Sequence, residues 1–263
     1  MKEAIMVALV NNKGGVAKTT SAVNLAAGIA AEGLRVLLCD LDAQGSASLS
    51  LGLSRADLSP GAAEAILEGL PIREAIRPSS VKNLDILPGS MALASADLVL
   101  ADVKGRESVL KDKLKSIMAD YDFVVLDCPP SLGLLTVNAL TAADFFIIPL
   151  TPDYLALEGL VNLLEAVEKI RSGIGKTADL LGILLTLADR RLNVTEEIGN
   201  IIREHYEDLV FKTEIRVNVR LKEAPSFGKT IFDYDAKSAG AEAYRALTKE
   251  VLHRMGRHDR TTA

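Results

Sequence analysis

The feature that most constrains the fold is a regular alternation of short, uninterrupted apolar runs with stretches of helical pattern. Such runs are "AIMVALV", "RVLLCD", "LDILPG", "FVVLDCPP" and "FFIIPL". A strand whose residues are nearly all apolar is covered on both faces, and strands separated by helices pair in parallel through right-handed crossovers. We therefore predict an α/β fold, a doubly wound, mostly parallel sheet with helices on both faces.

The helical stretches fill the intervals between these runs. The first follows the opening run and ends at Gly33, and a long one extends from about 155 to 171. Another opens at "SPGAAEAILEG", with Ser59 as the expected cap and Pro60 in the first turn. "LLGILLTLAD" and "LVFKTEI" are predicted as further strands, and a last helix from about 236 to 255. In the absence of a repeat or linker, we predict one domain over 1–255 and a disordered polar tail over 256–263.

Composition excludes several classes of protein. The 263 residues are 49% hydrophobic, which is enough for a core. No apolar run approaches the roughly 20 residues that cross a bilayer, and the first residues lack a signal-peptide cleavage site, so we expect a cytoplasmic protein. The net charge of −5 means that any nucleic-acid binding needs a local basic patch. Cys39 and Cys128 are expected to be small buried side chains, and the histidines show no ligand pattern.

A glycine-lysine loop, "NNKGGVAKTT", connects the first run to the first helix. Glycines let backbone N–H groups point at a phosphate, and the helix N-terminus adds its dipole. In such a loop Lys18 neutralises phosphate charge and the Thr19 hydroxyl ligates Mg²⁺. The strict pattern G-x-x-x-x-G-K-[ST] is not met, since Asn12 and Ala17 occupy its glycine positions. A simple glycine-rich turn before a helix is the alternative.

Acidic residues end two of the predicted strands. Asp40 and Asp42 follow the second run two residues apart, on the same face, and Asp127 ends the run "FVVLD". One acid at a strand end is often a helix cap. Three of them beside a lysine-glycine loop instead indicate a site for a metal and phosphates.

At this point the chain resembles the ParA/Soj partition ATPases of the ParA/MinD superfamily. "KGGVAKTT" fits the deviant phosphate-loop signature K-G-G-x-x-K-[ST], and "DLDAQG", "LDCPPSLGLLTVNAL", "ALEGL" and "VRLKEAPSFGKTI" extend the resemblance from about Ile5 to Val251. The chain departs from the family at Ala17, commonly glycine, and at Ala43, commonly proline. Around 216–219, "IRVNVRL" replaces "IPRNVRL". The resemblance implies the deviant P-loop NTPase fold.

The resemblance also implies ATP and Mg²⁺ as cofactors and assigns residues to them. Lys18 and the loop backbone would hold the phosphates, and Thr20 would contact the α-phosphate region. Thr19 would ligate Mg²⁺, with Asp40 and Asp127 holding the water shell of the metal. The positions around the nucleotide are Lys13, Gly14, Gly15, Val16, Ala17, Lys18, Thr19 and Thr20.

Catalysis is expected to involve Lys13, Lys18 and Asp42. By resemblance, Asp42 would orient or deprotonate the attacking water. Lys13 would reach across a homodimer formed on ATP to the phosphates of the other subunit, as an arginine finger does in trans. Hydrolysis of ATP to ADP and phosphate would be slow and stimulated by a ParB-like adaptor.

Proteins of this family bind double-stranded DNA without sequence preference and segregate or position a plasmid, chromosome origin or other cargo, so the resemblance implies a nucleoid-associated protein. No aromatic residues lie among the candidate contacts, which favours the backbone of a duplex. We expect these contacts to lie in loops; they are Arg190, Arg191, Arg216, Arg220 and Lys222.

Two alternatives belong to other classes. A membrane-associated spatial regulator similar to MinD needs an amphipathic C-terminal anchor, but after Met255 only the last alanine is apolar, so no membrane partner is expected. An iron–sulfur ATPase similar to the nitrogenase iron protein needs paired cysteines at a dimer interface, an arrangement that Cys39 and Cys128 do not offer.

Overall fold

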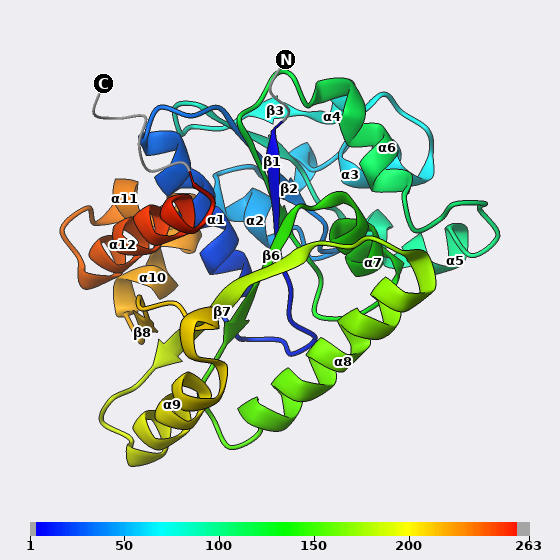
Figure 1. The fold of residues 1–263 in the computed structure, drawn as a ribbon. Helices are drawn as coiled ribbons and strands as arrows, with labels where there is room; N and C mark the ends of the chain where they lie inside the picture. The colour runs from blue at the N-terminus through cyan, green and yellow to red at the C-terminus, as the bar shows by residue number, and fades with distance from the viewer. Residues whose placement is uncertain (1–3, 257–263) are drawn as a thin grey trace.

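The computed structural model describes residues 4–256 (Figure 1). Within them an eight-stranded sheet has the order β3-β4-β2-β5-β1-β6-β7-β8, in which every pairing is parallel except the antiparallel β3–β4. The predicted doubly wound, mostly parallel sheet is confirmed. The predicted tail, apart from Gly256, lies outside the described residues. The strands are β1 Ile5–Leu9, β2 Val36–Asp40, β3 Arg77–Pro78, β4 Leu84–Leu87, β5 Phe123–Asp127, β6 Phe145–Leu150, β7 Asp179–Ala188 and β8 Ile215–Arg216.

Helices cover both faces of this sheet (Figure 1). One face packs against α1, α2 and α10 to α12, and the other against α3 to α9. The helices are α1 Lys18–Ala31, α2 Ser46–Ser50, α3 Ala62–Leu67, α4 Ile72–Ala75, α5 Ala96–Val99, α6 Val109–Leu114, α7 Leu134–Ala142, α8 Ala156–Ile174, α9 Asn193–Tyr206, α10 Val219–Glu223, α11 Ile231–Tyr234 and α12 Ala239–Arg254.

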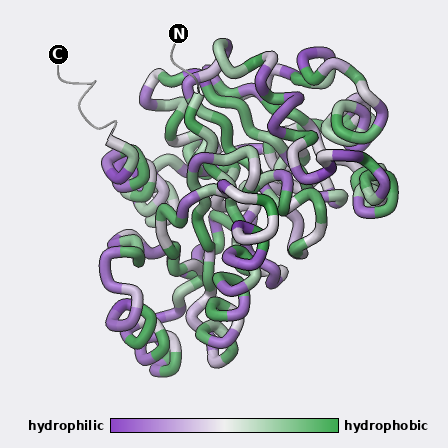
Figure 2. Tube along the Cα trace, turned by 45° about the vertical axis from the view of Figure 1, so that its right-hand side comes forward, coloured by the Kyte–Doolittle hydropathy of each residue, from purple (hydrophilic) through white to green (hydrophobic). Residues whose placement is uncertain are grey.

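The core consists of two apolar layers separated by the sheet. Along β1, Met6 and Ala8 belong to the layer under α3 to α9, whereas Val7 and Leu9 belong to the layer under α1 and α12. Figure 2 shows the hydrophobic residues concentrated along the central strands. Both faces of each inner strand are therefore buried, which explains the continuous apolar runs in the sequence.

Two local predictions are wrong. The helix expected to be capped by Ser59 begins at Ala62 with Gly61 as its N-cap, because the Glu64 carboxylate accepts hydrogen bonds from the Gly61 amide (2.7 Å) and the Ser59 hydroxyl (2.6 Å). The segment "LVFKTEI" contributes only an isolated bridge at Val210 and the two-residue β8.

Cys39 and Cys128 are buried, as expected. No helix within residues 4–256 is long and apolar enough to cross a membrane. The carboxyl ends of β1, β2 and β5 meet at one edge of the sheet, and this edge holds the residues that the sequence singled out.

Candidate nucleotide site

The loop after β1 is held by three hydrogen bonds, two of which reach other strands. The Asn11 side chain donates to the Pro149 carbonyl (2.7 Å) and accepts from the Lys13 amide (2.9 Å). On the far side the buried Thr186 hydroxyl of β7 donates to the Val16 carbonyl (2.9 Å). Sequence reasoning missed Asn11 and Thr186 because their partners lie far along the chain.

Left-handed backbone shapes the same loop. Gly15 has φ 76° and Ala17, the N-cap of α1, has φ 56° and ψ 32°. Glycine adopts this region freely, whereas a residue with a Cβ carries a cost of roughly 1–2 kcal/mol. The departure from the family pattern at Ala17 therefore falls on a position whose conformation favours glycine.

Lys18 lies folded back over the loop at the start of α1. It is 7% exposed, and its ammonium group donates to the Asn11 carbonyl at 3.0 Å. Burial lowers the pKa of Lys18, while Asp127, Cys128 and Asp42 oppose that shift. The half-buried Thr19 and Thr20 follow in the first turn, so the loop amides, an ammonium and two hydroxyls converge at one helix N-terminus. This arrangement suits an anionic phosphate group.

Asp40 and Asp127 lie directly opposite each other on neighbouring parallel strands and are both completely buried. Asp40 is well satisfied, because it accepts from the Ser48 amide (2.9 Å), the Ser48 hydroxyl (2.7 Å) and the Asp42 amide (3.2 Å). Burial raises the pKa of Asp40 to about 6, although the bonds from Ser48 oppose this. Asp40 therefore braces the loop that carries Asp42.

Asp127 is in the opposite situation. Neither of its carboxylate oxygens has a hydrogen-bond partner of normal geometry. Burial raises the pKa of Asp127 well above its ordinary value, Asp40 adds to the shift, and the nearby Thr19 hydroxyl and Lys18 ammonium only partly oppose it. A buried acid with unpaired oxygens is what a water-coordinated cation would satisfy. The residues present therefore fit Mg²⁺ held through Thr19 and Asp127.

Asp42 and Lys13 lie at the open side of the site. Asp42 is half-buried, accepts from the Gln44 amide at 3.0 Å, and borders a cavity of about 180 Å³ that Asp97 and Ser131 also line. Lys13 is exposed, and its ammonium group pairs with Asp153 at 2.5 Å. Sequence reasoning missed Asp153, which follows β6 and lies 140 positions away. The Lys13 ammonium is thus paired with a carboxylate that follows β6.

Within residues 4–256, no group of three or more His, Cys, Asp and Glu side chains could hold a metal ion.

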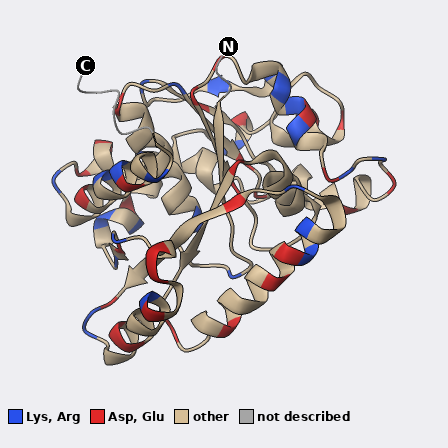
Figure 3. Ribbon diagram, viewed as in Figure 1, with Lys and Arg blue, Asp and Glu red and all other residues tan. Residues whose placement is uncertain are grey.

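The candidate DNA contacts are only partly brought together. Arg190 and Arg216 share one carboxylate oxygen of Glu214, each at 2.8 Å, whereas Arg191 pairs with Asp189 at 2.6 Å. The expectation that all five candidates lie in loops is wrong, because Arg216 lies in β8 and two others lie on α10. Figure 3 shows basic residues around α10 and both acidic and basic residues along α8.

The candidate DNA contacts on α10 also lie beside acidic residues. Arg220 pairs with Glu223 (2.9 Å) and Asp235 (3.4 Å), while Lys222 lies on the same short helix, exposed at the surface. The basic charge of this surface is therefore offset by carboxylates from the same chain.

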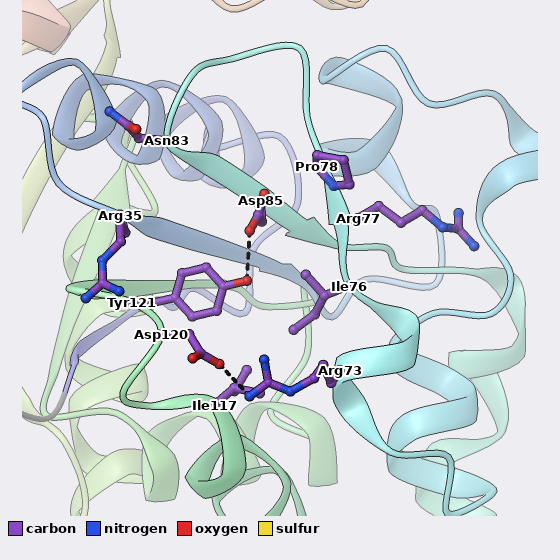
Figure 4. Close-up of a pocket in the computed structure, with 10 residues that line it drawn as sticks. All are labelled: Arg35, Arg73, Ile76, Arg77, Pro78, Asn83, Asp85, Ile117, Asp120 and Tyr121. Atoms are coloured by element: carbon purple, nitrogen blue, oxygen red, sulfur yellow. Dashed lines mark hydrogen bonds and ion pairs between the residues drawn. The ribbon is translucent and has the colours of Figure 1, made fainter.

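A separate cavity of about 430 Å³ lies at the opposite end of the strands (Figure 4). Two pairs form among its polar groups: Tyr121 donates to Asp85 at 2.9 Å, and Arg73 pairs with Asp120 at 2.6 Å. Arg77 also lines the cavity, and its Nη1 has no hydrogen-bond partner. We assign no ligand to this cavity.

The fold and the phosphate loop together define a nucleotide-binding protein of the phosphate-loop NTPase class. A family model described as an AAA domain matches residues 4–180. The chromosome partitioning protein ParA of Myxococcus xanthus is 42% identical over 95% of this chain and 88% of its own length. The sporulation initiation inhibitor protein Soj of Bacillus subtilis is 43% identical over 94% of this chain and 97% of its own length. The chain belongs to the ParA/Soj family of partitioning ATPases.

Solved structures agree on the fold. Cobyrinic acid a,c-diamide synthase from Mycobacterium smegmatis, with bound ADP and magnesium, is 33% identical over 96% of both chains, with a TM-score of 0.84. The septum site-determining protein MinD from Pyrococcus horikoshii, in complex with Mg-ADP, is 23% identical with a TM-score of 0.79; at that identity the likeness concerns the fold alone.

Proposed function

We propose that this protein is a Mg²⁺-dependent ATPase that dimerises on ATP, binds duplex DNA without sequence preference and positions a plasmid, chromosome origin or other cargo. The observation that carries the proposal is the meeting of the Lys18 loop with Asp40, Asp42 and Asp127 at one sheet edge. Membership of a partitioning ATPase family supports the same conclusion.

In this proposal Thr19 and Asp127 hold Mg²⁺, which neutralises the β- and γ-phosphate charge when it is bound. Asp42 orients or deprotonates the attacking water from the open side of the site. Asp40, which the resemblance assigned to the water shell of the metal, is proposed instead to keep the Asp42 loop in place, because Ser48 and the Asp42 amide already occupy its oxygens. Lys18, folded back over the loop of its own chain, would bind the phosphates held there.

Lys13 is the residue proposed to act in the partner subunit. Its ammonium group is exposed and held only by a surface ion pair, which is typically worth 0–1 kcal/mol. In a closed dimer two such lysines would each make a charge-assisted contact to phosphate in a dry interface, at roughly 1.5–3 kcal/mol apiece. The ion pair with Asp153 is thus weak enough to be exchanged for the phosphate contact.

Lys13→Gln tests this assignment in an Asp42→Ala background that prevents turnover. The variant is expected to bind Mg-ATP with near-normal affinity, while its dimerisation constant falls by about two to four powers of ten and DNA binding is lost. Lys169→Gln, which removes an exposed lysine on α8, is the matched control. Light scattering that finds an undiminished Lys13→Gln dimer would exclude a role in trans.

DNA binding is proposed to use the basic residues of β8, α10 and the turn after β7. The protein would then act in the cytoplasm, bound to the nucleoid. A ParB-like adaptor bound to DNA would stimulate the otherwise slow hydrolysis. Binding to a random duplex should require Mg-ATP and weaken steeply with salt. Equal binding by the nucleotide-free protein would contradict a surface that is completed by dimerisation.

The membrane alternative has less support. Leu247 and Val251 of α12 are completely buried against the α1 layer and are not available to a bilayer. We therefore propose no membrane partner. Co-sedimentation with anionic liposomes in Mg-ATP tests this, and a bound fraction well above the liposome-free control would favour the MinD-like function.

A further inference from the structure

Asn24 joins the phosphate-loop helix to a distant part of the chain. It lies on α1, is 5% exposed, and its side-chain amide donates to the Thr20 carbonyl at 2.8 Å. Its Oδ1 accepts from the backbone amide of Ile231 at 2.8 Å, across 207 positions of sequence. Both ends of this side chain are therefore engaged, one toward the start of α1 and the other toward the first residue of α11.

The segment that Asn24 holds is internally braced. The Tyr234 hydroxyl of α11 donates to Glu223 of α10 at 3.0 Å, and Glu223 also pairs with Arg220. The Phe227 and Tyr234 rings stack with their centroids 5.2 Å apart. These contacts connect α10 and α11, so residues 219–235 are expected to move together.

This braced segment carries three of the basic side chains at the surface between α10 and α11. Arg220 and Lys222 lie on α10, and Lys229 lies two residues before Ile231. The hydrogen bond from Ile231 to Asn24 fixes the end of the segment that is adjacent to Lys229. Asn24 thus lies between the helix that begins at the phosphate loop and the surface proposed to meet DNA.

We propose that Asn24 is a positioning residue that couples nucleotide binding to the orientation of segment 219–235. The inference rests on the proposed ATP-dependent DNA binding and adds the connection within one subunit. A shift of the first turn of α1 on nucleotide binding would be carried through Asn24 to Ile231 and hence to the basic side chains. Asn24 itself contacts neither phosphate nor DNA in this mechanism.

The same helix offers a matched control. Ser21, completely buried and one turn before Asn24, makes a 3.1 Å hydrogen bond with the Tyr244 hydroxyl of α12. Ser21→Ala removes a buried hydrogen bond of α1 that does not lead to segment 219–235. Asn24→Ala removes the buried hydrogen bond that leads to this segment. Similar losses of Tm are therefore expected, but only Asn24→Ala should affect coupling.

The experiment measures binding of a fluorescent random duplex with and without a non-hydrolysable ATP analogue and Mg²⁺. In the wild type and in Ser21→Ala, the analogue should tighten DNA binding at least tenfold. In Asn24→Ala this ratio should fall at least fivefold, with the affinity for the analogue within twofold of wild type. Asn24→Asp keeps an acceptor for the Ile231 amide but loses the donor to the Thr20 carbonyl, so it should retain only part of the ratio. An unchanged ratio in Asn24→Ala, or an equal loss in Ser21→Ala, would overturn the proposal.

Hydrogen exchange separates this inference from the proposed function. The analogue should change amide exchange in peptides covering 219–235 in the wild type and in Ser21→Ala, but not in Asn24→Ala. If the wild type binds no DNA with nucleotide, the proposed function fails, and the exchange result alone decides the coupling. The coupling through Asn24 would be refuted if amide exchange in the 219–235 peptides did not change with nucleotide in the wild type. It would also be refuted if exchange changed equally in Asn24→Ala.

Discussion

Asp127→Asn should make the nucleotide-free protein more stable while impairing its function. Asp127 is completely buried, both of its oxygens lack a hydrogen-bond partner, and Asp40 stands opposite it on the next strand. The asparagine has nearly the same shape but carries no charge. It therefore reduces the burial cost and removes the charge repulsion from Asp40, at the expense of the favourable contacts of the Asp127 carboxylate with Thr19 and Lys18.

The expected gain can be bounded from these contacts. An unsatisfied buried polar group costs about 1–3 kcal/mol and a charged one more, and the lost attraction to Lys18 offsets part of this. We therefore expect a net gain of about 1–3 kcal/mol at pH 7.5. For a chain of this size, each 1 kcal/mol shifts Tm by about 2–4 °C, which differential scanning fluorimetry resolves easily.

The pH dependence has a definite sign. The pKa of Asp127 is raised in the folded protein, so the folded state binds the proton more tightly than the unfolded state, whose pKa is about 4. The cost of Asp127 is thus absent below about pH 4 and grows as the pH rises. The advantage of Asp127→Asn should accordingly be larger at pH 7.5 than at pH 5.

The assay has a control and a second readout. Asp144→Asn removes a carboxylate that is satisfied, since it accepts from the Met6 amide at 2.9 Å, and it should lower Tm or leave it unchanged. Mg-ATP should raise the Tm of the wild type by more than that of Asp127→Asn, because the metal site is impaired. An Asp127→Asn protein no more stable than the wild type at pH 7.5, or one whose advantage is greater at pH 5, would refute the reasoning.

Two further predictions concern the phosphate loop. Ala17→Gly should raise the free energy of unfolding by about 1 kcal/mol, because Ala17 has φ 56° and glycine adopts that region freely; a urea titration measures this, and a lower midpoint would argue against strain at Ala17. Asp153→Asn should tighten Mg-ATP-dependent dimerisation several-fold, because it releases Lys13 from an exposed ion pair worth about 0–1 kcal/mol. Analytical ultracentrifugation measures that constant, and a weaker dimer would show that Asp153 supports the interface rather than competing with it.

Sequence patterns predicted what depends on neighbours along the chain. The apolar runs predicted the parallel sheet, and the loop before Lys18 predicted a phosphate site at the carboxyl edge of β1. The segment "LVFKTEI" shows where such patterns fail. Its Lys212 and Thr213 amides bond to the Glu250 carboxylate of α12 at 2.8 and 3.0 Å, and Phe211 packs beneath the guanidinium of Arg254. Partners supplied by α12 take the place of a neighbouring strand.

The three acids of the site show the same limit within one motif. Sequence spacing places Asp40, Asp42 and Asp127 at one edge, and the family resemblance assigned Asp42 to the water and the other two to the metal, but neither shows which carboxylates the fold satisfies. Their environments differ because Ser48 satisfies Asp40, solvent reaches Asp42, and the oxygens of Asp127 are left unpaired. Each difference depends on which backbone or hydroxyl group the fold brings within 3 Å. The division of roles among the three acids is therefore a tertiary property, and mutating each acid in turn should give three distinct phenotypes rather than one.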